Sequence, residues 1–156
     1  MLGKLTRRSL WLLLAGITST FAAQAADLTI NQLRVRGPAG GNDEFVELFN
    51  ASPATLDLSG YKLNASNDSG TTGTRLTFPS GTTLAPGCYL LLTNTASAGY
   101  SGSVAGDLSY NTGVTDTCGV AVLDTSGNIV DQIGLSTGST YKEGTPLASL
   151  GTGNTD

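Results

Sequence analysis

The segment Glu44-Phe45-Val46-Glu47-Leu48-Phe49-Asn50 has the pattern of a β-strand that is apolar on both faces. Val46 and Leu48 point to one side of such a strand, and Phe45 and Phe49 point to the other. Apolar side chains on both faces are typical of a strand inside a sheet rather than at its edge. The segment therefore predicts a β-protein in which this strand is central.

Further extended segments occur along the rest of the chain. The sequence predicts strands at residues 28–36, 56–63, 76–78, 82–84, 88–93, 108–110, 119–123 and 129–133. Ser59-Gly60 predicts a bend within the second of these. Residues 64–74 are almost wholly Ser, Asn, Asp, Gly and Thr, and are predicted to be a loop. No helical apolar period occurs after residue 25, so we predict an all-β sandwich.

The composition excludes most enzyme classes. The chain has no His, which removes the usual general base near neutral pH and the commonest zinc ligand. Neither a Ser-His-Asp nor a Cys-His catalytic arrangement can form without it. We therefore expect no catalytic residue, no cofactor and no metal ion in this segment.

Residues 1–25 have the three-part layout of a secretory signal peptide. A basic start with Lys4, Arg7 and Arg8 precedes an apolar stretch, and Ala23-Gln24-Ala25 supplies small residues for cleavage. A membrane anchor is the alternative, but the apolar stretch is shorter than the roughly 20 residues that a spanning helix needs. We expect cleavage near Ala25 and a secreted, periplasmic or cell-surface location.

The leader is compatible with two export routes, the twin-arginine route and the general secretory route. Thr6-Arg7-Arg8-Ser9-Leu10 resembles a twin-arginine export motif, but adjacent arginines also occur in ordinary leaders. After residue 25 no segment is long and apolar enough to cross a membrane. That part of the chain carries five basic and twelve acidic residues. Such an acidic chain repels phosphate backbones, so we expect no direct binding to nucleic acids.

The chain has two cysteines, Cys88 and Cys118. In an oxidising compartment an even pair in one small domain is most simply a disulfide. Two unpaired thiols are the alternative. We expect one intramolecular disulfide between Cys88 and Cys118.

Several motifs together resemble the lamin tail domain family. They are Asp43-Glu44-Phe45-Val46-Glu47-Leu48-Phe49-Asn50, Leu56-Asp57-Leu58-Ser59-Gly60-Tyr61-Lys62-Leu63, Phe78-Pro79-Ser80-Gly81-Thr82-Thr83-Leu84-Ala85-Pro86-Gly87-Cys88-Tyr89-Leu90-Leu91-Leu92, and the hairpin at residues 119–131. The resemblance covers nearly all of residues 28–135, in order. It implies an immunoglobulin-like β-sandwich of the type found in nuclear lamins and in exported bacterial proteins.

The chain departs from the family pattern at two points. Tyr61 stands where the family often has Trp, so a hydroxyl there needs a partner. The family usually continues with another strand that bears basic residues, whereas this sequence ends at Asp156. We therefore expect residues 26–156 to form a lamin-tail-like domain that lacks its last strand, within a longer protein, and to keep an unpaired sheet edge.

The acidic residues offer few candidate sites. Glu44 and Glu47 resemble a catalytic carboxylate pair, but residues three apart on a strand face opposite sides. Asp124, Asn128 and Asp131 carry oxygen ligands for calcium, yet such residues in a hairpin loop usually bond to their own turn. Asp57, Asp107 and Asp116 are expected to be turn or surface residues. The glycine-rich residues 37–41 lack the Lys and the helix of a phosphate-binding loop.

The family resemblance, the absence of His and the lack of a candidate catalytic site together indicate a non-catalytic module. In bacteria the family commonly stands beside other domains and is regarded as adhesive or as positioning its neighbours. We expect an exported binding, adhesion or domain-positioning module whose partner is a protein or a surface ligand. The alternative is an accessory domain of a secreted nuclease or phosphatase whose catalytic domain lies beyond Asp156.

Overall fold

The computed structural model describes residues 27–148, and all regular structure in this range is β-strand. The strands are β1 (Leu28–Arg34), β2 (Phe45–Asn50), β3 (Leu56–Asp57), β4 (Lys62–Ser66), β5 (Thr72–Thr77), β6 (Thr83–Leu84), β7 (Tyr89–Asn94), β8 (Leu108–Tyr110), β9 (Gly119–Leu123) and β10 (Ile129–Gly134). Each strand that the sequence predicts has a counterpart here, including two short pieces on either side of Ser59-Gly60. The predicted signal peptide, residues 1–25, lies outside the described residues.

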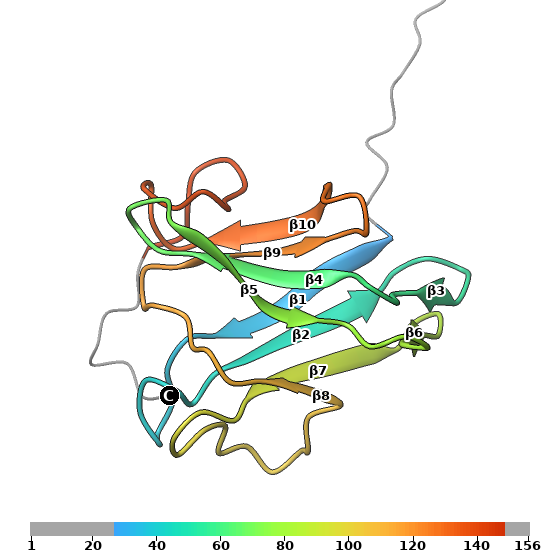
Figure 1. Ribbon diagram of the computed structural model, residues 1–156, viewed down its shortest axis with the longest axis horizontal. Helices are drawn as coiled ribbons and strands as arrows, with labels where there is room; N and C mark the ends of the chain where they lie inside the picture. Colours follow the sequence, from blue (N-terminus) through green and yellow to red (C-terminus); the bar gives the residue numbers. More distant parts are fainter. Residues whose placement is uncertain (1–26, 149–156) are drawn as a thin grey trace, which may run out of the picture.

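Two four-stranded sheets form a β-sandwich (Figure 1). The first sheet has the order β1-β2-β7-β8, the second has the order β10-β9-β4-β5, and β3 pairs with β6 in a small separate sheet. Only the β7–β8 pairing is parallel among the described strands. β1 lies against β10 on one side of the sandwich, and β5 lies against β8 on the other. β2 is central in its sheet, which confirms the prediction from its two apolar faces.

The core lies between the two sheets. In β2 the alternation is complete, because Val46, Leu48 and Asn50 are buried while Phe45, Glu47 and Phe49 are partly exposed. The facing sheet contributes Leu63, Ala65, Val120 and Val122, and the largest fully buried side chain is Phe78. Burial of such side chains is the main favourable term in folding. Tyr61, which replaces the family's Trp, packs against this core while partly exposed.

The prediction that residues 64–74 form a loop is wrong. β4 continues to Ser66 and β5 starts at Thr72, so the polar segment is a hairpin with a short turn. Asn67 closes the turn, because its backbone N–H donates to Thr71 O and its side-chain oxygen accepts from the N–H groups of Ser69 and Thr71. The loop was predicted because the side chains of this segment are polar. The side chains of an exposed edge strand need not be apolar for its backbone to pair, however.

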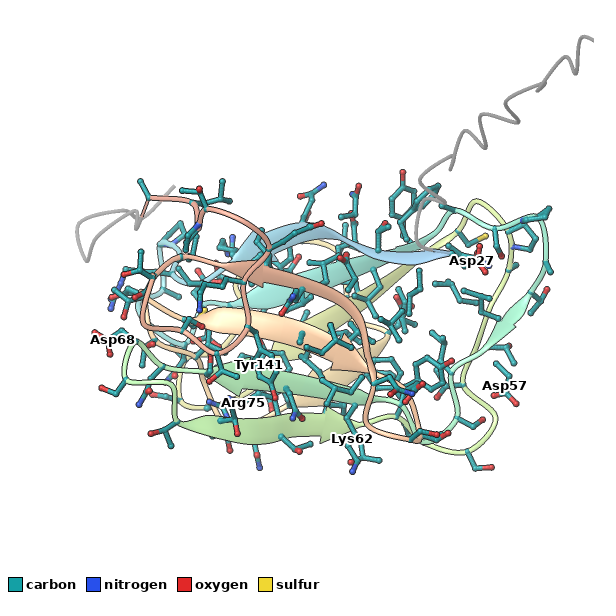
Figure 2. All side chains as sticks on the ribbon, turned by 90° about the horizontal axis from the view of Figure 1, so that it is seen from above. Asp27, Asp57, Lys62, Asp68, Arg75 and Tyr141 are labelled. Carbon is teal, nitrogen blue, oxygen red and sulfur yellow. The ribbon has the colours of Figure 1, made fainter. Side chains whose placement is uncertain are left out.

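Residues 136–148 contain no strand, and they pack over part of the outer face of the second sheet, at Asn64 and Ser66 of β4. The hydroxyls of Ser139 and Ser66 share a hydrogen bond, and Thr140 Oγ1 donates to Gly70 O. Asn64 Nδ2 donates to the hydroxyl of Tyr141, which is buried against β4 (Figure 2). This segment therefore contacts the outward-facing residues Asn64 and Ser66 of β4, whereas Lys62 at the start of the strand is exposed.

The structure does not contain the disulfide expected between Cys88 and Cys118, since both cysteines are free in it. Cys88 lies at one end of β2, where its carbonyl accepts from Asn50 N. Cys118 lies toward the other end, within the electrostatic influence of Glu44. Six residues of extended chain separate these ends by about 20 Å, whereas a disulfide requires Cα atoms within roughly 7 Å. The sequence showed two strand ends but not that they lie at opposite ends of the sandwich.

The two thiols should differ sharply in reactivity. Cys88 is exposed and should react with a thiol reagent in the native protein. Cys118 is fully buried, and burial together with the charge of Glu44 raises the pKa of its thiol to about 12. We expect titration to find one reactive thiol in native protein and two after denaturation without reductant. A count of zero in the denatured protein would show that the disulfide forms after all.

Candidate functional site

A buried carboxylate joins three segments at one end of the sandwich. Glu44, just before β2, is fully buried. Its Oε1 accepts from Val114 N at 2.9 Å, and its Oε2 accepts from Asn94 Nδ2 at 2.9 Å and from the hydroxyl of Tyr110 at 3.4 Å. The side chain therefore ties the end of β7, the end of β8 and the segment before β9 to the start of β2.

The electrostatics of Glu44 follow from its burial. Burial raises the pKa of this carboxyl, although the hydrogen bonds from Val114, Asn94 and Tyr110 and the charge of Arg75 act in the opposite direction. Burial and the adjacent Glu44 charge likewise raise the pKa of the Tyr110 hydroxyl. A perturbed pKa can mark a catalytic group, but it does so only where the group faces a cleft. Glu44 has no exposed surface, and its contacts join neighbouring segments of the chain.

Asp43 organises the neighbouring loops. Its carboxylate pairs with Arg34 and accepts from Ser101 Oγ, from Ser101 N at 2.9 Å and from Ala39 N at 3.0 Å. Burial opposes ionisation, but these hydrogen bonds and the charge of Arg34 together lower the pKa of Asp43. Gly37 packs so closely that an added Cβ would lie 2.5 Å from Asp43 Oδ2. The glycine-rich residues 37–41 thus wrap a carboxylate of the same chain.

The other acidic candidates do not form a shared site. Glu47 faces away from Glu44, as predicted, and accepts from Asn31 Nδ2 at 2.6 Å. Asp124 accepts from the backbone N–H groups of Ser126 and Asn128 within its own hairpin loop. Asp131 instead accepts from Ile30 N of β1 at 2.6 Å, so it does not face Asp124 or Asn128. No cluster of three or more potential metal ligands occurs within residues 27–148.

The remaining acidic candidates bond to turns or neighbouring side chains. Asp57 accepts from Ser59 N, Asp107 accepts from Leu91 N, and Asp116 pairs with Arg36. These contacts agree with the turn and surface roles predicted for them.

The outer face of the first sheet carries a row of aromatic residues. At one end, the rings of Phe45 and Tyr100 meet edge to face with centroids 5.8 Å apart. The guanidinium of Arg34 lies 5.1 Å from the centroid of Phe45 and 5.2 Å from that of Tyr100. Cation–π contact and the ion pair with Asp43 hold this arginine in place.

At the other end of the same face, Phe49 and Tyr89 have ring centroids 4.8 Å apart. Tyr89 is 54% exposed, and Leu91 lies beside them on β7 with partial exposure. Asn31 and Gln32 of β1 are exposed at the margin. We call Phe45, Phe49, Tyr89, Leu91 and Tyr100 the aromatic face. This face consists of large apolar groups, and the neighbouring cation Arg34 is already paired with Asp43.

A comparison with protein families matches residues 22–137, well over half of the chain, to the Lamin Tail Domain. The chain belongs to the lamin tail domain family. The two-sheet architecture agrees with that family's immunoglobulin-like β-sandwich, and such a domain fits a non-catalytic binding module. A search of curated proteins gave no match. Residues 27–148 of this lamin tail domain include no helix that could cross a membrane.

Sequence reasoning missed several parts of this lamin tail domain. The sequence places Phe45 and Phe49 on one side of the strand, opposite Val46 and Leu48, but this pattern indicates only a central strand and not an exposed aromatic surface. The partners Tyr100 and Tyr89 lie 55 and 40 residues further along the chain, as the numbering shows, so no local pattern joins them. Asn94 and Ser101 stand in a segment that the sequence marks only as polar.

Proposed function

We propose that this lamin tail domain is an exported, non-catalytic binding module that holds a protein partner on its aromatic face. The leader at residues 1–25 supports export. The observation that carries the proposal is a difference between the two sheets. Residues 136–148 cover part of the outer face of the second sheet at β4, whereas the aromatic face carries Tyr89 at 54% exposure.

The composition of the aromatic face suits a protein interface. Tyr, Phe and Arg are enriched at such interfaces, and a few aromatic anchors supply most of the binding energy. Tyr89 and Phe49 support one another, so little conformational entropy remains to be lost when a partner binds. A contiguous exposed apolar patch on a soluble domain commonly marks an interaction site.

The charges around the aromatic face define the partner further. Three acidic residues lie around Phe49, Tyr89 and Leu91, namely Asp27, Glu47 and Asp107. Arg34, which lies beside Phe45 and Tyr100, is paired with Asp43. Charge complementarity therefore favours a protein that presents basic residues around an apolar centre. A second copy of this domain would bring acidic residues against acidic residues, which disfavours self-association.

Binding of the purified protein to intact cells of the producing organism tests this function. Cells that lack the protein are incubated with purified labelled protein, and the bound amount is measured against concentration. We expect saturable binding that Tyr89→Ala weakens about tenfold, because loss of an interface anchor costs about 1.4 kcal/mol or more. Ile129→Ala is the matched control, since Ile129 is exposed and apolar but lies on β10 of the other sheet.

Two results would contradict the proposal. One is equal binding by the parent protein, Tyr89→Ala and Ile129→Ala. The other is the absence of saturable binding by the parent protein to its own cells.

A further inference from the structure

An arginine lies between two polar hollows where β5 meets β8, away from the aromatic face. Arg75 is an extra residue in the β4–β5 ladder, because Leu63 pairs with Leu76 and Asn64 pairs with Thr74. Such a bulge turns a side chain out of the regular alternation of the strand. Here it accompanies an arginine that reaches from β5 to residue Gly113.

The guanidinium of Arg75 uses only some of its N–H groups as hydrogen-bond donors within the described residues. Its Nε donates to Gly113 O at 3.0 Å, and its Nη1 donates to Gly73 O at 3.1 Å. A guanidinium has five N–H groups, so the other three have no hydrogen-bond partner within residues 27–148. The hydrogen bonds to Gly113 O and Gly73 O hold the planar guanidinium in a defined orientation. This orientation prepares it for a bidentate contact with an oxyanion.

No carboxylate neutralises Arg75 by direct contact. The ion pairs within the described part of the chain are Arg34–Asp43 and Arg36–Asp116. The charge of Arg75 acts on Glu44, but that carboxylate is buried and already accepts three hydrogen bonds. Arg75 is therefore a partly exposed cation without an ion-pair partner, in a chain whose net charge is −4.

Both hollows beside Arg75 are lined by neutral polar groups. The first has a volume of about 260 Å³ and includes Asn67, Thr71, Thr72 and Thr115. The second has a volume of about 220 Å³ and includes Thr95, Ser109 and Asn111. Neither lining contains an acidic residue. Hydroxyl and amide groups on both sides of one cation match a ligand with one negative charge among many hydroxyls.

We propose that Arg75 and its two hollows bind a carboxylated sugar, such as a uronic acid unit of a glycan. The carboxylate accepts two N–H groups of the guanidinium, and the ring hydroxyls bond to the amide and hydroxyl side chains of the hollows. A phosphate polymer fits less well, because it brings many charges to a site with one cation on an acidic domain. A neutral sugar leaves the arginine without its anion.

A matched pair of ligands tests the site. Methyl glucuronide and methyl glucoside differ only at C6, where the first has a carboxylate and the second has a hydroxymethyl group. Both are titrated into isotopically labelled protein while backbone amide shifts are recorded. We expect saturable shifts at Gly73, Gly113 and Asn111 with the glucuronide, and about tenfold weaker binding of the glucoside, as expected for loss of a charge-assisted bidentate contact.

Variants separate the site from general charge effects. Arg75→Gln should weaken glucuronide binding about tenfold, and Asn111→Ala should weaken it while leaving the arginine in place. Lys62→Gln is the control, because Lys62 is an exposed cation on the adjacent strand β4 and lines neither hollow (Figure 2). If Arg75→Gln fails to fold, the ligand pair and Asn111→Ala still decide the question.

Three results would overturn the proposal. Equal affinity for the two glycosides removes the role of the carboxylate. Saturation of the same amides by inorganic phosphate at the same concentration shows a general anion site. An equal loss in Lys62→Gln and Arg75→Gln shows that only net charge matters. Because the aromatic face takes no part in this test, its outcome is independent of the proposed protein partner.

Discussion

Glu44→Ala is expected to lower the free energy of unfolding by about 3 kcal/mol. The substitution leaves Val114 N, Asn94 Nδ2 and the hydroxyl of Tyr110 without their acceptor inside the protein. Each unsatisfied buried donor costs about 1–3 kcal/mol, and relief from burying a charge offsets part of this loss. Urea denaturation at neutral pH measures the change as a lower midpoint with an unchanged slope.

Glu47→Ala is the matched control for this experiment. The two residues have the same side chain and lie three positions apart, but Glu47 is partly exposed and bonds to the exposed Asn31. We expect a change within about 0.5 kcal/mol for Glu47→Ala. Equal midpoints for the two variants would show that Glu44 does not hold the loops together.

The pH dependence of stability gives Glu44 and Asp43 opposite signs. The pKa of Glu44 is raised from its ordinary value of 4.5, so its contribution favours folding at low pH and is lost as pH rises through the folded-state value. The pKa of Asp43 is lowered from 3.8, so its contribution is present above that value and is lost as pH falls. Glu44→Gln should remove the first component and keep the second. A pH profile of stability unchanged in Glu44→Gln would contradict the raised pKa.

Leu48→Ala is expected to cost about 3–4 kcal/mol of stability. Leu48 is 0% exposed and points from the central strand β2 into the space between the sheets. Truncation of a buried leucine loses the transfer free energy of the removed atoms and leaves a cavity that the neighbours fill only partly. Thermal and urea denaturation should both show the loss.

Leu91→Ala provides the comparison from the aromatic face. Leu91 lies on the neighbouring strand β7 but is partly exposed. Its truncation should cost about 1 kcal/mol, because part of its surface already contacts water. A loss as large as that of Leu48→Ala would mean that the outer face of the first sheet is covered in the folded protein.

The sequence allowed the β-sandwich to be predicted because its strands have a local signature. β2 and the β9–β10 hairpin combine apolar alternation with turn residues, and both occur where predicted. The β4–β5 hairpin has no such signature, since its exposed side chains are polar and its register rests on backbone pairing. Residues 136–148 likewise carry only Tyr141 as a large buried side chain.

The candidate sites could not be predicted to the same extent. The pairing of Cys88 with Cys118 was predicted because they are an even pair in a small exported domain, but the two residues lie at opposite ends of the sandwich. Glu44 meets Tyr110 and Val114 across 66 and 70 residues of chain, and Arg75 meets Gly113 across 38. Contacts of this range depend on how the sheets are assembled, which the residue types themselves do not encode in any local pattern.

Site-specific crosslinking in producing cells tests the binding role of the aromatic face most directly. A photoreactive amino acid is placed at Leu91 in one protein and at Lys62 in another, and adducts are identified by mass spectrometry. We expect one dominant adduct from position 91, to a protein with a basic surface. This adduct should be absent from position 62 and lost when Tyr89→Ala is added. Equal adducts from both positions, or an adduct at position 91 that survives Tyr89→Ala, would contradict it.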